Sequence, residues 1–103
     1  MEKRRPTYDL KRIKEAFASV RNLGRATTAT AFRNAQELGV SREDMIEVIR
    51  SLQTSDFYKS MTAYANPRRW QDVYHTRFRD RELYIKFTVK PDGGYLLLSF
   101  KEK

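Results

Sequence analysis

The sequence predicts an α+β domain in which three N-terminal helices pack on one face of a twisted, mainly antiparallel β-sheet. The spacing of apolar residues is helical up to Leu52 and has a period of two after it, so helices and strands are segregated along the chain. This order is typical of α+β domains, whose helices cover one sheet face and leave the other open. With 103 residues and 40% apolar content, residues 1–103 are expected to form a single domain.

The N-terminal quarter of the chain should contain an extended arm and a first helix. Residues 3–7 are basic and include a proline, so we expect them to be extended. Asp9 is a suitable N-cap for the helix that follows, and Gly24 is a suitable stop. The apolar residues of this helix recur at helical spacing: Leu10, Ile13, Phe17 and Val20.

Two further helices have clear start and stop signals. Thr27 or Thr28 can cap the second helix, and Gly39 can close it. Its inward residues are Phe32, Ala35 and Leu38. Ser41 and Asp44 resemble a capping box that opens the third helix. The buried stripe of that helix comprises Met45, Ile46, Val48, Ile49 and Leu52.

The C-terminal half reads as about four strands. A charged turn is expected over residues 77–81, and residues 91–94, Pro-Asp-Gly-Gly, form a second turn. The residues expected to face the core on either side of the second turn are Leu83, Ile85, Phe87, Val89, Leu96, Leu98 and Phe100. The open sheet face would then present Tyr84, Lys86, Tyr95 and Lys101.

Polar residues concentrate in two of the predicted strands, which suggests a functional site. Residues 55–61, Ser-Asp-Phe-Tyr-Lys-Ser-Met, and residues 70–74, Trp-Gln-Asp-Val-Tyr, carry Lys, Tyr, Gln and Asp among apolar positions. Whether Lys59 reaches the open face depends on strand register, because a slip of one residue reverses every side chain. An ordinary amphipathic strand with a solvated lysine is the alternative.

The charge of the chain favours an anionic partner. Twenty-one Lys and Arg against 13 Asp and Glu give a net charge of +8 and a pI near 10.0. Nucleic acid is favoured over a membrane, because the longest apolar run is only Tyr-Leu-Leu-Leu at residues 95–98. No leader segment is recognised and there is no cysteine, which fits a cytoplasmic protein without disulfides. No cofactor or metal site is expected, because His75 is the single histidine and no ligand grouping is visible.

A helix-turn-helix is a weaker interpretation of the same helices. Ala35, Gly39, Val40 and Val48 have suitable sizes and spacing. The second helix of that pair would begin Ser-Arg-Glu-Asp at residues 41–44, and its carboxylates would face phosphates and base edges. This charge argues against DNA reading.

RNA cleavage without a metal ion is compatible with the residues present. RNA carries its own nucleophile, the 2′-OH, so a protein need only move two protons and stabilise charge on the phosphate. Lys, Arg, Tyr and Gln side chains can do this if they converge. His75 is a tempting base, but a surface histidine or one satisfied by neighbours is favoured, since the sequence names no partner for it.

Four stretches resemble the MqsR family of ribonuclease toxins from bacterial type II toxin-antitoxin pairs. They are residues 55–62, residues 70–74, Tyr-Ile-Lys at 84–86 and Ser-Phe-Lys-Glu-Lys at 99–103. The resemblance implies a RelE-like fold and a metal-independent mRNA interferase that cuts at GCU and GCA. It implies a catalytic centre of Lys59, Gln71 and Tyr84. It also implies that Tyr58, Met61 and Lys101 bind the RNA.

The resemblance also implies a protein partner. This would be an MqsA-like antitoxin with a zinc-binding N-terminal domain that holds the toxin and a helix-turn-helix domain that binds DNA. The competing interpretation of the basic, aromatic sheet face is a non-catalytic RNA-binding module.

Overall fold

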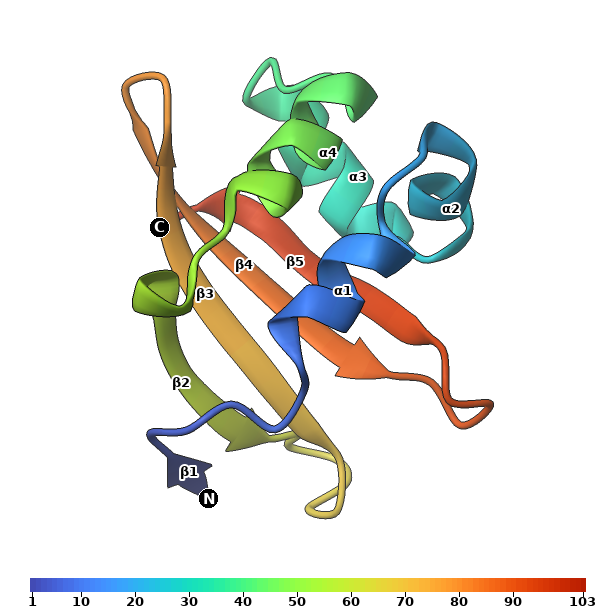
Figure 1. The fold of residues 1–103 in the computed structure, drawn as a ribbon, viewed down its shortest axis with the longest axis vertical. Helices are drawn as coiled ribbons and strands as arrows, with labels where there is room; N and C mark the ends of the chain where they lie inside the picture. The colour runs from blue at the N-terminus through green and yellow to red at the C-terminus, as the bar shows by residue number, and fades with distance from the viewer.

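The computed structural model describes residues 1–103 and confirms the α+β fold class, with the helices in the N-terminal half (Figure 1). The helices are α1 (Leu10–Ala16), α2 (Val20–Arg25), α3 (Ala29–Glu37) and α4 (Arg42–Ser51), followed by a short 3₁₀ turn, Thr54–Asp56. The strands are β1 (Glu2–Lys3), β2 (Phe57–Thr62), β3 (Trp70–Phe78), β4 (Arg81–Val89) and β5 (Tyr95–Glu102). None of the helices has the length and apolarity needed to cross a membrane.

The first predicted helix is two helices, so the expected number of three is wrong. Phe17 ends α1, and Ser19 starts α2 by accepting a hydrogen bond on its hydroxyl from the Asn22 N–H at 3.1 Å. Serine competes well for such a capping role, which the apolar spacing alone does not reveal. As a result Val20 is 39% exposed, contrary to expectation, and Leu23 takes the buried position.

The other two helices begin and end as predicted. Thr28 caps α3 by accepting from the Ala31 N–H, and Gly39 follows the helix with a φ of +76°. Ser41 and Asp44 form the capping box of α4. The side chains buried in these two helices are Ala31, Ala35, Met45, Val48 and Ile49.

The five strands form one antiparallel sheet in the order β1-β2-β3-β4-β5. The helices lie together on one side of it, and β1 lies beside the end of β2 at the far edge (Figure 1). The helical layer is tied to β5, because the Leu97 N–H donates to Ala26 O at 2.7 Å and Leu97 O accepts from the Thr28 N–H. Of the arm expected to be extended over residues 3–7, only Lys3 is in a strand, β1, which pairs with β2; bends follow at residues 4–5 and 7–8.

The core fills the space between the helices and this covered face of the sheet. Tyr74, Ile85 and Phe100 are aligned across β3, β4 and β5, and all are buried. Phe87 joins the two layers, since its ring lies 5.5 Å from Phe17 in the α1 layer and 6.0 Å from Tyr74. The period of two in the sequence is thus the signature of burial on one face.

A bulge in β5 corrects the expected alternation in this strand. Lys86 pairs with Ser99 but Phe87 pairs with Leu97, so β5 carries one extra residue, Leu98. Leu97 is therefore fully buried, whereas Leu96 and Leu98, both expected in the core, are only half-buried.

The same shift in alternation moves Tyr95. This residue was expected on the open face, but it packs against the core cluster, and its ring meets Tyr8 edge-on at 6.0 Å. The other predicted open-face residues of β4 and β5 keep their places, because Tyr84 pairs with Lys101 and Lys86 lies one step away on the same face.

Truncating Phe87 to Ala should lower the free energy of unfolding by about 3–5 kcal/mol, because the deletion leaves a cavity between the helices and the sheet. Chemical denaturation followed by circular dichroism measures this change. Arg33→Ala, on the exposed side of α3, is the control and should change stability by less than about 0.5 kcal/mol. Equal effects of the two substitutions would contradict this description of the core.

Candidate functional site

The sheet side away from the helices, here called the open face, gathers polar and aromatic side chains from four strands. The cross-strand pairs that define it are Lys59–Val73, Met61–Gln71, His75–Tyr84, Tyr84–Lys101, Val73–Lys86 and Lys86–Ser99. All six residues predicted for the site lie on it: Tyr58, Lys59, Met61, Gln71, Tyr84 and Lys101. Val73 also lies there; it is fully buried yet is not part of the core cluster.

A second bulge, in β2, decides the orientation of Lys59. Phe57 pairs with Tyr74 on the covered face, and Lys59 pairs with Val73 on the open face, so Tyr58 is the extra residue. Tyr58 and Lys59 therefore both reach the open face although they are consecutive. Ser60 then returns to the covered face, where its hydroxyl lies 2.8 Å from Thr7 Oγ1.

Five of the open-face residues are in mutual contact, and we call them the aromatic cluster: Tyr58, Lys59, His75, Tyr84 and Lys101. The ring of His75 stacks on Tyr58 at 4.2 Å and lies 5.7 Å from the ring of Tyr84. Lys59 Nζ is 5.4 Å from the centre of the Tyr58 ring, and Lys101 Nζ is 5.2 Å from that of Tyr84. Two cations thus flank three stacked or tilted rings.

Gln71 and Met61 lie outside this cluster. They pair with each other on β3 and β2, and Gln71 precedes His75 by four residues. At a rise of about 3.3 Å per residue the two backbones are about 13 Å apart along β3. The structure therefore brings four of the six predicted residues together, and the other two follow on the same face, two residues beyond the Lys59–Val73 pair and beside Lys59 rather than His75.

Glu2 from the N-terminal arm sets the charge of Lys59. The two side chains form an ion pair, and β1 pairs with β2 at the position that allows it. The hydrogen bond to Glu2 raises the pKa of Lys59 and lowers that of Glu2. A lysine that acts as a general base needs a lowered pKa, so the raised pKa argues against that role and keeps Lys59 in its ammonium form at neutral pH.

Burial has different consequences for the neighbours of Lys59. It raises the pKa of Tyr84, which keeps its phenol protonated at neutral pH. It lowers the pKa of Lys86, with Lys101 adding a like-charge contribution. It also lowers the pKa of His75, which makes the neutral imidazole the main form at pH 7.

Three further residues lie at the open face beside the six predicted site residues: His75, Arg4, and Lys86, which the alternation of β4 predicts on this face. The structure places His75 half-buried on the open face, as the middle member of the aromatic cluster. His75 lies four residues after Gln71 in the same strand, so strand alternation places both side chains on one face. This spacing was the signal in the sequence that could have identified His75. Arg4 lies 5.8 Å from the Tyr58 ring and donates to Tyr58 O at 3.4 Å, and no pattern in the sequence indicated this contact.

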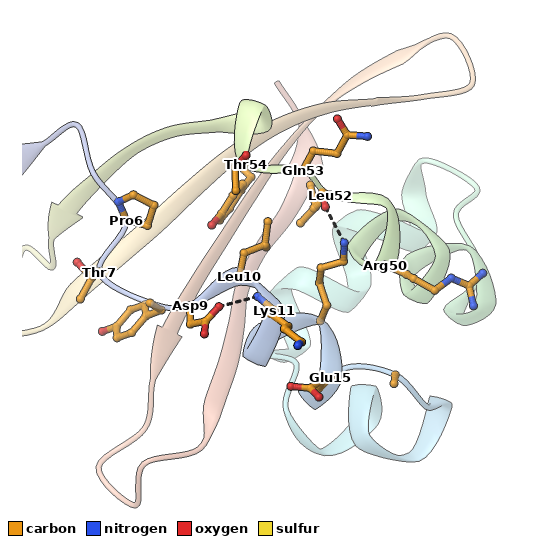
Figure 2. A pocket seen from close by; sticks show the side chains of 14 residues that line it. Pro6, Thr7, Asp9, Leu10, Lys11, Glu15, Arg50, Leu52, Gln53 and Thr54 are labelled. Atoms are coloured by element: carbon orange, nitrogen blue, oxygen red, sulfur yellow. Dashed lines mark hydrogen bonds between the residues drawn. The ribbon is translucent and has the colours of Figure 1, made fainter.

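A larger cleft lies away from the open face. It has a volume of about 890 Å³ and lies between the start of α1 and the connection from α4 to β2 (Figure 2). Leu10, Leu52 and Tyr74 contribute to its lining, and Lys14 Nζ donates to Leu52 O across it at 2.8 Å. Because Tyr74 belongs to the covered side of the sheet, this cleft and the aromatic cluster do not share a surface.

Comparison with known proteins agrees with the resemblance. The family model described as "Motility quorum-sensing regulator, toxin of MqsA" matches residues 5–102. The mRNA interferase toxin MqsR of Escherichia coli (strain K12) is 45% identical over 104 residues, which cover 100% of both chains. These matches define the class of the chain as the toxin component of a toxin-antitoxin pair. It belongs to the MqsR toxin family, which confirms the family inferred from the sequence.

No group of three or more His, Cys, Asp or Glu side chains has an arrangement that could hold a metal ion. The polar groups that converge on the open face are instead ammonium, phenol and imidazole groups from the aromatic cluster, with the amide of Gln71 farther along. These groups can donate or accept protons and stabilise an anion.

Replacing Glu2 with Gln should lower the pKa of Lys59, because the hydrogen-bonded carboxylate that raises it is removed. Titration of the Lys59 side chain by NMR in both proteins measures the difference. Glu47→Gln, on the exposed surface of α4, is the matched control and should leave Lys59 unchanged. An unchanged Lys59 pKa in Glu2→Gln would show that the ion pair does not form in solution.

Proposed function

We propose that this toxin is a metal-independent endoribonuclease that cleaves mRNA at short GC-containing sequences such as GCU and GCA, with the open face as its active site. The ribose 2′-OH is the nucleophile. The whole of residues 1–103 acts as one toxin domain, and the reaction takes place in the cytoplasm, where the mRNA is. The name of the Escherichia coli relative, an mRNA interferase, supports the substrate class.

The observation that carries this proposal is the aromatic cluster with its charged Lys59. Attack by the 2′ oxygen places additional negative charge on the phosphate, which an ammonium group stabilises. Lys59 and Lys101 supply two such groups on either side of the rings. Tyr84 keeps its proton, so it can donate a hydrogen bond to a phosphate oxygen or protonate the departing 5′ oxygen.

Each predicted role draws on the aromatic cluster and on the part of the open face beside it. Lys59, Gln71 and Tyr84 are the catalytic residues, and Gln71 contacts the RNA backbone or base beside the cluster. Tyr58, Met61 and Lys101 bind the RNA. Tyr58 is 42% exposed, and its ring is suited to stacking on an unpaired base.

The second partner is an antitoxin protein. The family description names MqsA as the antitoxin of this type of toxin. We assign the partner of this chain to the same kind, with a zinc-binding N-terminal domain that holds the toxin and a helix-turn-helix domain that binds DNA. The net charge of +8 suits an acidic protein surface as well as RNA.

A non-catalytic RNA-binding module is the second candidate, because stacked aromatic rings beside cations also occur on surfaces that only bind single strands. Incubation of the purified protein with a transcript containing GCU separates the two functions. New RNA ends support the toxin activity. An intact transcript that remains bound supports the binding module.

Cleavage should proceed at an unchanged rate in EDTA and should leave a 2′,3′-cyclic phosphate and a 5′-OH, because 2′-OH attack needs no metal-bound water. Product ends can be identified by mass spectrometry. A substrate with a 2′-deoxy sugar at the cleaved position is the control and should remain intact. Activity that disappears in chelator and returns with Mg²⁺ or Mn²⁺ would refute this mechanism.

Lys59→Ala should reduce single-turnover cleavage about a hundredfold or more while weakening RNA binding only modestly, since its ammonium acts on charge that develops in the transition state. Affinity is measured on the uncleavable 2′-deoxy analogue and the rate on the matching RNA. Arg33→Ala removes one cation from the helical side and should preserve the rate. Equal losses of affinity and rate in Lys59→Ala would make Lys59 a binding residue.

A further inference from the structure

His75 occupies the middle of the open face without a structural task that explains it. One side of its ring stacks on Tyr58 with an angle of 21° between the planes, and Tyr84 approaches at 42°. Stacking engages the faces of an imidazole, whereas both nitrogens lie in the ring plane and point outward at its edge. His75 is therefore held in orientation by its neighbours while its nitrogens remain able to exchange protons.

The edge of His75 also borders a small hollow. This hollow has a volume of about 170 Å³, and its lining comes from the 3₁₀ turn, β3, β4 and the C-terminal end of the chain. No hydrophobic residue lines it, and its charged lining comprises Asp56 and Glu82 as well as Arg77 and Lys103. Arg77 and Lys103 both form ion pairs with Glu82, so the hollow is polar without an excess of positive charge.

We infer that His75 is the general base of the reaction, the residue that takes the proton of the attacking 2′-OH. This inference rests on the ribonuclease function proposed above. It assigns the proton-accepting step to a group that is held in the cluster between Tyr58 and Tyr84, next to the ammonium of Lys59.

Charged and titratable groups reach His75 from every neighbouring element. Asp56, Tyr58 and Lys59 lie on the β2 side, and Arg77 is on its own strand. On the other side are Glu82 and Tyr84 of β4, and Lys101 and Lys103 of the C-terminal segment.

The balance of these groups favours the neutral imidazole. Burial is the largest cause of the lowered pKa of His75, followed by the positive charge of Lys103; Glu82 opposes the shift and Lys59 adds to it. No hydrogen-bond partner is among the causes. A base that is unprotonated at neutral pH can accept a proton.

The step balances with groups that the open face supplies. The 2′ oxygen forms a bond to phosphorus as its proton passes to a ring nitrogen of His75. The bond from phosphorus to the 5′ oxygen breaks, and that oxygen takes a proton from the Lys59 ammonium or the Tyr84 phenol. The products are a 2′,3′-cyclic phosphate and a 5′-OH, after which His75 returns its proton to water and the donor regains one.

The test compares wild type, His75→Phe and His75→Ala in single-turnover cleavage of a GCU-containing RNA from about pH 5 to 8. The wild-type rate should rise with pH through an ionisation below 6.5 and then level off, because the protonated imidazole cannot act as a base. His75→Phe preserves the stack on Tyr58 and should cost about 10²- to 10⁴-fold in rate while losing that ionisation. Its affinity for the 2′-deoxy analogue should remain within a few-fold of wild type.

His75→Ala leaves space for a small molecule, so added imidazole should restore part of its rate but none of the rate of His75→Phe. A His75→Phe protein that keeps the wild-type rate and pH profile would overturn the assignment and reduce His75 to a stacking residue, with the ribonuclease function intact. A wild-type rate without an ionisation below 6.5 would overturn it as well. A wild-type protein that binds but does not cut RNA would refute the proposed function and this inference together.

Discussion

A buried carboxylate, Asp72, fixes the relation between the N-terminal arm and the sheet. It is fully buried, and its oxygens accept hydrogen bonds from the Thr7 N–H at 3.0 and 3.1 Å and from the Tyr8 N–H at 2.9 Å. An unpartnered carboxylate would be costly in this position, whereas one that accepts several backbone N–H groups is stable. The arm must therefore pass over the end of β3. This path leads residues 2 and 3 along β2, where Glu2 reaches Lys59.

The layers of the fold were readable from the sequence because burial on one face imposes a period. The helical spacing before Leu52 and the alternation after it predicted the segregated α+β architecture, and the capping residues of α3 and α4 predicted where those helices begin. What the pattern missed are local interruptions. Ser19 divides one predicted helix into two, and Leu98 adds a residue to β5, which reverses the alternation on one side of it. A bulge is determined by pairing with another strand, so a single strand's sequence does not locate it.

In the predicted site, too, residue types were readable from the sequence, whereas positions that depend on strand pairing were not. Lys59 could not be oriented from the sequence, since the extra residue Tyr58 is defined only by the pairing of β2 with β3. That bulge is what allows consecutive residues to reach one face. The sequence names no partner for His75 because its neighbours come from other strands: Tyr58 precedes it by 17 positions and Tyr84 follows it by nine. Gln71 and Met61 pair with each other two residues beyond the Lys59–Val73 pair, a position that residue types do not encode.

The N-terminal arm contacts residues that are far away in the sequence; Thr7 and Asp72, for example, are 65 positions apart. Docking of the arm therefore closes a long loop and depends on few contacts. Such a segment frays before the core unfolds. Each fraying event separates Glu2 from Lys59, so the docked arm and the charged lysine stabilise each other by linkage. The stability that the charged Lys59 adds to the docked arm is present at neutral pH and is lost as the pH rises through the raised pKa of Lys59, above 10.5. The stability that the charged Glu2 adds is lost as the pH falls through the lowered pKa of Glu2, below 4.5. Between these limits, the frayed state also uncovers the edge of β2, a backbone that can pair with another strand.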